Sequence, residues 1–168
     1  MGGSDGGKET QQAMDLLSIY FGNQQELVEK PRMMSIINSS SSLRYNRDSM
    51  DKLFIHAQYG QPALITAAVM GGTTGPITLA GTMAQANAET LAGIALIQMV
   101  REGTPAVYGA QSTLADMRSG AYVLASPEHA LCLCAGARLA KFYGLPCLGG
   151  GARAMPGSCQ AGVVPRAC

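Results

Sequence analysis

The sequence predicts an α/β fold with a parallel sheet, and three features support this prediction. Residues 62–70 are apolar without alternation, which is typical of a strand covered on both faces. Such segments alternate with helical patterns at repeats of roughly 30 to 40 residues, so right-handed crossovers between parallel strands are expected. Glycine accounts for 21 of 168 residues and charged residues for only 14%, as expected for buried strands joined by tight loops. A doubly wound open sheet and a barrel segment both fit this pattern.

The first elements are an amphipathic helix and one strand–loop–helix unit. Residues 1–8 are expected to be flexible, and apolar residues at helical spacing predict a helix over 9–21. A buried strand is predicted at 32–38, and it leads into a serine-rich loop whose side chains favour turns. Asp48 is the expected N-cap of a helix over 49–59.

The second unit begins with the strand at 62–70, which ends on the glycine-rich loop 71–75. Pro76 is placed for the first turn of a long helix that extends to about Arg101. The third strand is predicted at 106–108.

The remaining elements complete the third and fourth units. A turn of helix is predicted at 114–118, and a longer helix is predicted over 126–143 with Ser126 as its N-cap. A final strand is predicted at 146–150. Because sequential βα units neighbour one another, the four strands are predicted to pair in chain order, all of them parallel.

Charge and cysteine content exclude several classes of partner. The formal net charge is +1 and the basic residues are scattered, so neither nucleic acid nor an anionic membrane is expected as a partner. A small neutral or zwitterionic ligand fits this balance. The five cysteines show no regular pairing, which argues against a secreted disulfide framework and for the reducing cytoplasm. No stretch has the length and apolar character that predict a signal peptide or a membrane span.

Chemistry in a parallel sheet gathers where strands end and helices begin, because backbone N–H groups and helix dipoles point there. The loops predicted to lie together at that end are 38–44, 71–75, 108–112 and 149–153. The side chains in them that are predicted to bind substrate are Asn38, Arg44, Thr73, Thr74, Tyr108, Gln111 and Ser112. The pattern identifies no catalytic residue.

The glycine-rich loop and a polar group of residues in the long helix both have a purely structural explanation. The loop 71–75 could donate N–H groups to an anion, but a tight strand-to-helix turn would need the same glycines. Gln85, Asn87 and Glu89 are expected to be buried polar groups that tie the long helix to the sheet.

The histidines and the paired thiols are predicted to have no chemical role. His56 and His129 have no neighbour at a metal-ligand spacing, so solvated helix positions are expected and no metal is predicted. Cys132 and Cys134 lie within one helical segment and are predicted to be buried packing thiols rather than a redox pair.

Family motifs lie in three stretches of the chain, GQPALITAAVMGGTTGPITLAGTMAQANAETLAG, PAVYGAQSTLADMRSG and SPEHALCLCAGARLAKFYGLP. With TLAG, AQANAE and AKFYGLP in this order and at these separations, residues 25–151 resemble the trimethylamine methyltransferase family. The resemblance implies a partial (β/α)₈ TIM barrel over 9–151, with about four consecutive βα units, followed by a divergent tail at 152–168. Because a complete barrel usually needs about 250 residues, it also implies a fragment.

The resemblance implies transfer of a methyl group from a methylated or quaternary amine to the cobalt(I) of a corrinoid carried on a separate protein. The implied partners are a corrinoid protein and a small methylated amine. No cofactor is expected to be bound tightly by this chain, and a homo-oligomer is compatible with the resemblance. Because cobalt(I) is an intense nucleophile, positioning should matter more than acid–base chemistry. Tyr108 is expected to face an ammonium through its ring, and the loop 71–75 is expected to hold a betaine carboxylate.

One departure from the family bears on the substrate. Its founding enzymes use pyrrolysine, which this sequence does not show, and related members that lack it act on substrates such as glycine betaine. Two alternatives stay open: a non-catalytic amine-binding module, and an inactive truncated product.

A part of a barrel should also differ in solution from the complete barrel. The chain alone is expected to be inactive, and to self-associate or expose apolar surface. The side chains predicted to face missing strands are Ile36, Ile65, Val69 and Val107.

Overall fold

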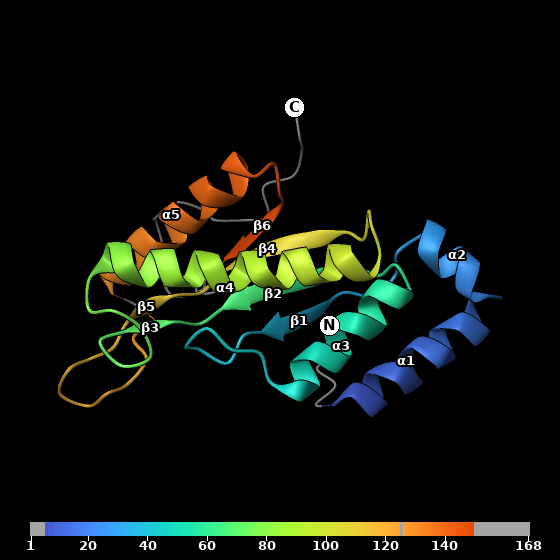
Figure 1. Cartoon of the computed structure of the whole chain (residues 1–168), viewed down its shortest axis with the longest axis horizontal. Coiled ribbons are helices and arrows are strands. Elements are labelled where there is room, and N and C mark those ends of the chain that lie inside the picture. The colour runs from blue at the N-terminus through green and yellow to red at the C-terminus, as the bar shows by residue number, and fades with distance from the viewer. Residues whose placement is uncertain (1–5, 125, 150–168) are drawn as a thin grey trace.

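Helices and strands alternate along the chain in the computed structural model, which describes residues 6–124 and 126–149 (Figure 1). The helices are α1 (Gly7–Tyr20), α2 (Gln24–Glu29), α3 (Arg47–Gln58), α4 (Leu79–Val100) and α5 (Pro127–Phe142). The strands are β1 (Ser35–Asn38), β2 (Ala63–Ala67), β3 (Met70–Gly71), β4 (Ala106–Ala110), β5 (Thr113–Leu114) and β6 (Cys147–Gly149). None of the helices in these two ranges combines the length and apolar character needed to cross a bilayer.

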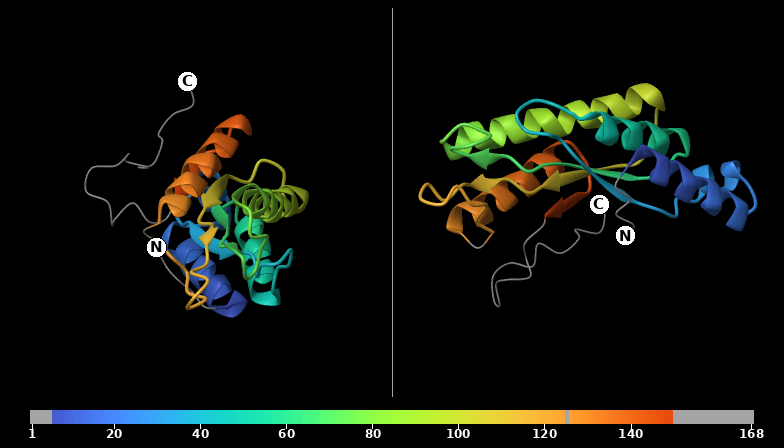
Figure 2. Two further views of the ribbon diagram at one scale, coloured as in Figure 1. Left: turned by 90° about the vertical axis from the view of Figure 1, so that its left-hand side faces the viewer. Right: turned by 90° about the horizontal axis from the view of Figure 1, so that it is seen from below.

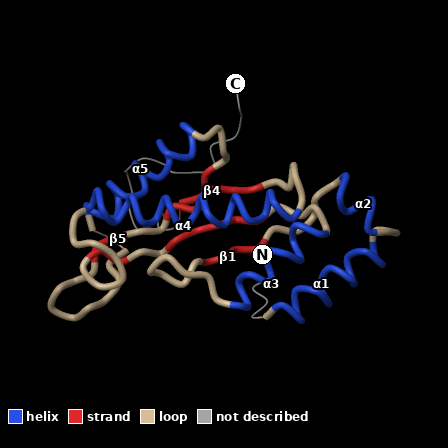
Figure 3. The backbone as a smooth tube through the Cα atoms, viewed as in Figure 1, coloured by secondary structure: helices blue, strands red, loops and turns tan. Residues whose placement is uncertain are grey.

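Four strands form a parallel sheet in the order β1-β2-β4-β6, which is also their order along the chain. The predicted parallel pairing of the four strands is therefore confirmed. The register places Ile37, Ile65 and Tyr108 in one row across the sheet. Because the strands are parallel, their carboxyl ends meet at a single edge, with the connecting loops at the left of Figure 3.

Helices α3, α4 and α5 pack side by side against one face of the sheet, here named the helix face (Figure 2). Its core joins Ile37 and Ile65 of the strands to Leu53 of α3 and Ile97 of α4. Each such side chain contributes about 1.5–3 kcal/mol on full burial. A doubly wound sheet in chain order would not have its neighbouring helices in contact on one face. The arrangement is consistent with a segment of a barrel wall, and the described strands form an open sheet.

The opposite face of the sheet, here named the second face, is defined by the alternation of side chains along each strand. Its strand residues lie in two rows, Ile36–Leu64–Val107 and Asn38–Thr66–Gly109. The side chain of Ile36 is 44% exposed on this face.

Two of the four side chains predicted to face missing strands point elsewhere. Ile36 and Val107 do lie on the second face, but Ile65 belongs to the core of the helix face. Val69 lies beyond the end of β2 and packs against Ala86 of α4. Because side chains alternate along a strand, Leu64 rather than Ile65 shares the face of Ile36 in the aligned register.

Helix starts differ from prediction where a nearby side chain makes a better cap. Asn46 rather than Asp48 caps α3, and its Oδ1 accepts a 2.7 Å bond from the N–H of Ser49. Thr78 caps α4, so Pro76 lies before that helix instead of within its first turn. The predicted N-cap of α5, Ser126, is confirmed.

The N-terminal helices also depart from the predicted boundaries. Helix α1 begins at Gly7, so residues 7 and 8 belong to it and not to the flexible segment predicted for 1–8. Residues 1–5 of that segment and the tail 152–168 lie outside the described residues. Helix α2 was not predicted, because six residues are too few for a periodic pattern, although Asn23 caps it.

The segment predicted as a turn of helix at 114–118 is instead a strand followed by a turn. Strand β5 pairs in parallel with β3, which extends the path of β2 beyond a break at Ala68 and Val69. The carboxylate of Asp116 accepts hydrogen bonds from the N–H of Arg118 and the hydroxyl of Ser119. These local bonds favour the turn over a helix.

Candidate functional site

Loops from separate βα units gather at the carboxyl edge of the sheet. The predicted loops 38–44 and 71–75 begin at the last residues of β1 and β3 and lie at this edge (Figure 3). Of the predicted loop 108–112, residues 108–110 belong to β4, and 111–112 follow that strand at the same edge. Gly149 ends β6 at the same edge, whereas 150–153 lie outside the described residues. The predicted clustering of the loops is confirmed for the described part.

The glycine-rich loop at 71–75 does not present a row of free amides. The N–H groups of Thr73, Thr74 and Gly75 all donate to the carbonyl of Met70, at 3.2, 3.0 and 3.0 Å, and that of Gly72 donates to Gly75 at 3.0 Å. These amides are therefore already engaged within the turn, and their binding of a substrate carboxylate stays a prediction. The glycines serve the turn itself, because Gly72 has a φ of 90°.

The two threonines of this loop are part of the same turn. The hydroxyl of Thr74 accepts a 3.0 Å bond from the N–H of Met70, and its carbonyl accepts from Nε2 of Gln85 at 3.1 Å. The exposed Thr73 donates its hydroxyl to the carbonyl of Met70 at 3.3 Å. Neither threonine is an obvious ligand group in this arrangement.

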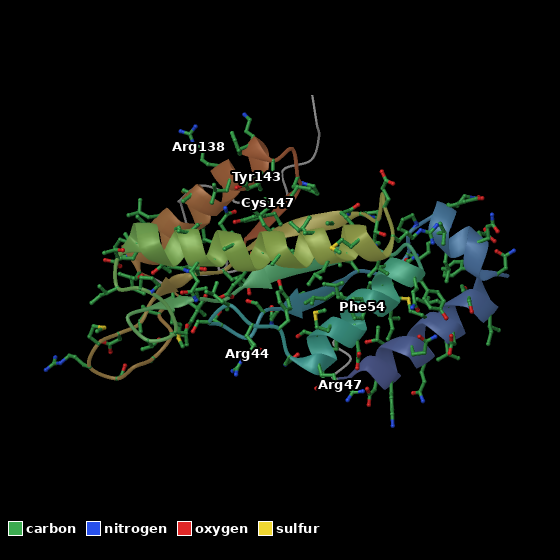
Figure 4. The ribbon with its side chains drawn as sticks, viewed as in Figure 1. Arg44, Arg47, Phe54, Arg138, Tyr143 and Cys147 are labelled. Atoms are coloured by element: carbon green, nitrogen blue, oxygen red, sulfur yellow. The ribbon has the colours of Figure 1, made fainter. Side chains whose placement is uncertain are left out.

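Tyr108 lies in the middle of β4 and points toward the helices, so the expectation that it faces an ammonium is corrected. Only 2% of Tyr108 is exposed. Its hydroxyl donates to Oδ1 of Asn87 at 3.0 Å, and Nδ2 of Asn87 donates to the hydroxyl of Tyr143 at 2.9 Å. Burial, followed by the proximity of Tyr143 and Cys147, raises the pKa of Tyr108. Figure 4 places the labelled Tyr143 and Cys147 close together.

The prediction that Asn87 ties the long helix to the sheet is therefore confirmed, and the contribution of its hydrogen bond with Tyr108 to stability can be measured. We expect Tyr108→Phe to lower the free energy of unfolding by about 1–2 kcal/mol, because it leaves a half-buried amide oxygen without its donor. Urea denaturation provides the measurement. Tyr20→Phe is the control, since the ring of Tyr20 is 81% exposed and its change should have no effect. Equal stability of the two variants would show that the Tyr108–Asn87 bond is unimportant.

Gln111 and Ser112 connect β4 to β5, and their polar groups bond to neighbouring parts of the fold. The Ser112 hydroxyl, which is buried, donates to the carbonyl of Ala67 at 3.1 Å. The carbonyl of Ser112 lies 3.2 Å from Nδ1 of His129, and the carbonyl of Gln111 accepts from the hydroxyl of Tyr122. The polar group of Ser112 is thus used within the fold.

Both histidines and one of the thiols differ from the sequence prediction. His56 and His129 are 0% and 2% exposed, so neither is a solvated helix position. Cys132 is buried as predicted, but Cys134 is exposed. Within residues 6–124 and 126–149, no group of three or more His, Cys, Asp or Glu side chains is arranged to hold a metal ion.

Asn38 and Arg44 are exposed predicted site residues whose side chains, unlike that of the exposed Thr73, make no hydrogen bond within the turn at 71–75. Asn38 is exposed on the second face at the carboxyl end of β1. Arg44 is exposed in the segment 39–45, here named the β1–α3 loop, and its guanidinium extends away from the body of the molecule (Figure 4).

Thr66, which the sequence reading missed, lies beside Asn38 in the sheet register. It is 0% exposed, and its hydroxyl has no hydrogen-bond partner among the described residues. A Cβ atom at position 109 would lie 2.7 Å from this hydroxyl oxygen, so Gly109 leaves the space that Thr66 fills. Thr66 sits within an apolar run, and only the pairing with Asn38 identifies it as part of this row.

Glu89 is the buried carboxylate of the edge, with 2% of its surface exposed. It accepts hydrogen bonds from the hydroxyls of Ser39 and Ser41, from the N–H of Leu43 and from Nε2 of Gln85. Burial alone would raise the pKa of Glu89, but these four donors outweigh it and hold the pKa below its ordinary value. Glu89 is therefore ionised at neutral pH and joins α4 to the β1–α3 loop.

Comparison with protein families identifies the family of the chain. The trimethylamine methyltransferase (MTTB) family model matches residues 1–162. The chain belongs to this family. The family resemblance of the sequence motifs is thereby confirmed.

Curated relatives of this chain are named for different substrates. Glycine betaine methyltransferase of Desulfitobacterium hafniense is 44% identical over 151 residues, which cover 90% of this chain and 32% of that enzyme. Trimethylamine methyltransferase MttB1 of Methanosarcina acetivorans is 33% identical over 141 residues, covering 83% and 28%. Proline betaine:corrinoid methyltransferase of Eubacterium limosum is 33% identical over 155 residues, covering 91% and 32%. The chain thus spans about a third of the length of these curated relatives.

Proposed function

We propose that this chain supplies four βα units of a barrel methyltransferase that moves a methyl group from a quaternary amine to the cobalt(I) of a corrinoid on a separate protein. The observation that carries the proposal is the family match over residues 1–162. It is supported by the parallel sheet with its helices on one face and its loops at one edge.

Methyl transfer requires the protein mainly to position its substrate. The C–N bond breaks with its electron pair left on nitrogen, and the new C–Co bond takes its pair from cobalt(I). No proton is transferred in this step, so the protein need supply no general acid or base. What it must do is bind the cation, orient one methyl group toward the corrinoid and exclude water.

The exposed polar groups favour an amine that also carries a carboxylate. The Arg44 guanidinium would repel trimethylammonium, but it can attract the carboxylate of a betaine. Asn38 adds an exposed amide donor on the second face, and beside it the buried hydroxyl of Thr66 has no partner among the described residues. We therefore favour a betaine, in line with the 44% identity to a glycine betaine methyltransferase, over trimethylamine.

The proposal is tested by placing this chain in a relative of full family length. We would replace the matching third of the Desulfitobacterium hafniense enzyme with residues 1–151 and follow loss of the cobalt(I) absorption of a corrinoid protein. We expect methylation with glycine betaine, slower methylation with trimethylamine, and none with the 168-residue chain alone. A folded hybrid that methylates with neither amine would contradict the proposed activity, and one that prefers trimethylamine would contradict the betaine assignment.

Thr66→Val separates a binding role from a structural one. Because the hydroxyl lacks a partner in the fold, its replacement by an isosteric methyl should leave the free energy of unfolding unchanged or raise it. If the hydroxyl donates to the substrate carboxylate, KM for glycine betaine in the hybrid should rise roughly tenfold. Val107→Thr on the same face is the control and should leave KM unchanged. A lower stability with an unchanged KM would assign Thr66 to the fold alone.

A further inference from the structure

The β1–α3 loop is held in a conformation that its own sequence does not favour. Leu43 has a φ of 56°, and it is the single non-glycine residue with positive φ in the described ranges. Its side chain is 70% exposed, so apolar burial does not compensate for this backbone geometry. The restraint comes from outside the loop, because the N–H of Leu43 donates to Oε1 of Glu89 at 2.8 Å.

The carboxylate of Glu89 accepts hydrogen bonds from the β1–α3 loop and from Gln85 of α4, which in turn donates to the turn at 71–75. Its Oε2 accepts from Ser39 and Ser41, both in the β1–α3 loop. Its Oε1 accepts from Leu43 and from Nε2 of Gln85 at 2.9 Å, and the same nitrogen donates to the carbonyl of Thr74 at 3.1 Å. The β1–α3 loop and the turn at 71–75 are thus joined through one pair of side chains, spaced one turn apart on α4.

A second contact fixes the far end of the β1–α3 loop to the same helix turn. The hydroxyl of Tyr45 donates to the backbone carbonyl of Glu89 at 2.7 Å. Burial, followed by the charge of Glu89, raises the pKa of Tyr45 to about 12, so Tyr45 keeps its proton as a donor. Asn38 and Arg44, two exposed polar side chains at this edge, lie just before this loop and within it.

We propose that Glu89 is a positioning residue that joins the β1–α3 loop to the turn at 71–75, forming one preformed rim that binds the methylated amine. Glu89 acts through the loop and does not touch the substrate. The assignment of the amine rests on the proposed function, whereas the joining of the two loops rests on the hydrogen bonds alone. A preformed rim avoids the entropy loss of ordering a loop when the ligand binds.

The loop half of the proposal is tested on the 168-residue chain with Glu89→Gln. Hydrogen exchange of residues 39–45 and trypsin cleavage after Arg44 should both become at least tenfold faster. Cleavage after Arg118, in the exposed turn near β5, should not change. Glu102→Gln is the matched control, because it makes the same change at an exposed site beyond the end of α4. Unchanged exchange in Glu89→Gln would overturn the proposal.

The pH dependence distinguishes the carboxylate from a general loss of packing. In the wild-type chain, protection of residues 39–45 should disappear as the pH falls through the depressed pKa of Glu89, below its ordinary value of 4.5. Tyr45 is the titratable group that faces Glu89, and it stays protonated throughout this range. Glu89→Gln should show no such step. Should that variant fail to fold, Ser41→Ala removes one donor from the loop side and should open the loop in the same direction.

The substrate half is tested in the methyl-transfer assay of the hybrid enzyme. Glu89→Gln should raise KM for glycine betaine at least tenfold and change kcat less than threefold, and Glu89→Asp should recover part of the loss. An open loop with an unchanged KM would overturn the rim while leaving methyl transfer intact. A wild-type hybrid without methyl transfer would overturn the proposed function and the amine with it, and the exchange measurement would still decide whether Glu89 joins the loops.

Discussion

The free energy of unfolding is expected to fall by about 3 kcal/mol between pH 7 and pH 4 because of His56 alone. His56 lies in α3 and is 0% exposed. Burial is the main cause that lowers its pKa from 6.5 to about 4; the backbone at Pro62 partly opposes this shift, and the charge of Lys52 adds to it. Neither ring nitrogen makes a full hydrogen bond that would compensate an imidazolium.

The sign follows from the two protonation states. Above pH 6.5 the ring is neutral in both the folded and the unfolded chain, so it causes no loss of stability. As the pH falls below 6.5, the unfolded chain binds a proton that the folded chain refuses, and stability decreases until the folded pKa near 4 is reached.

Urea denaturation at intervals between pH 7 and pH 5 measures this effect before the carboxylates titrate. His56→Leu should flatten the slope of unfolding free energy against pH in this window. Glu89→Gln should change that slope only at lower pH, where the carboxylate of Glu89 titrates below its ordinary pKa of 4.5. A wild-type profile that is flat from pH 7 to pH 5 would show that the imidazole is solvated or paired in solution.

Gly93→Val is expected to lower the free energy of unfolding by about 3 kcal/mol. A Cβ atom at position 93 of α4 would lie 2.7 Å from Cγ2 of Ile65 in β2, and it would also meet the hydroxyl of Tyr45. Replacing a glycine in a helix interior normally stabilises a protein, by about 1 kcal/mol for alanine. A net loss of stability in Gly93→Val would therefore come from overpacking against β2. The same variant should displace Tyr45 and loosen the β1–α3 loop.

Ala95→Val provides the matched comparison, because it introduces the same side chain two residues along α4 at an exposed position. We expect a change of less than about 1 kcal/mol there, from helix propensity alone. Similar losses for the two variants in urea denaturation would contradict the close packing of α4 on β2.

Helices α3, α4 and α5 and the four main strands could be predicted because each carries its signal within a short window. The unalternating apolar run at 62–70 and the cap at Ser126 are examples. The identity of the family could be predicted for the same reason, since its motifs are linear stretches of sequence. Boundaries were less certain where two capping residues compete, as Asn46 and Asp48 do before α3.

The site was harder to predict because a loop position does not say what a polar group bonds to. Thr74 and Ser112 lie in the predicted loops, but their polar groups are engaged by Met70 and Ala67. Tyr108 lies one row from the edge, and the alternation of the strand directs it toward α4. Such outcomes depend on register, which a single strand does not specify.

Local patterning in this chain was sufficient for its βα order and its parallel pairing, because periodicity, caps and turns act over a few residues. The face of each strand side chain, and the partners of each polar group, were decided only in the folded chain. Glu89 illustrates the reason: it meets donors from residues 39 to 43, some 46 to 50 positions away, and such a contact exists only once β1 and α4 are packed on the same sheet.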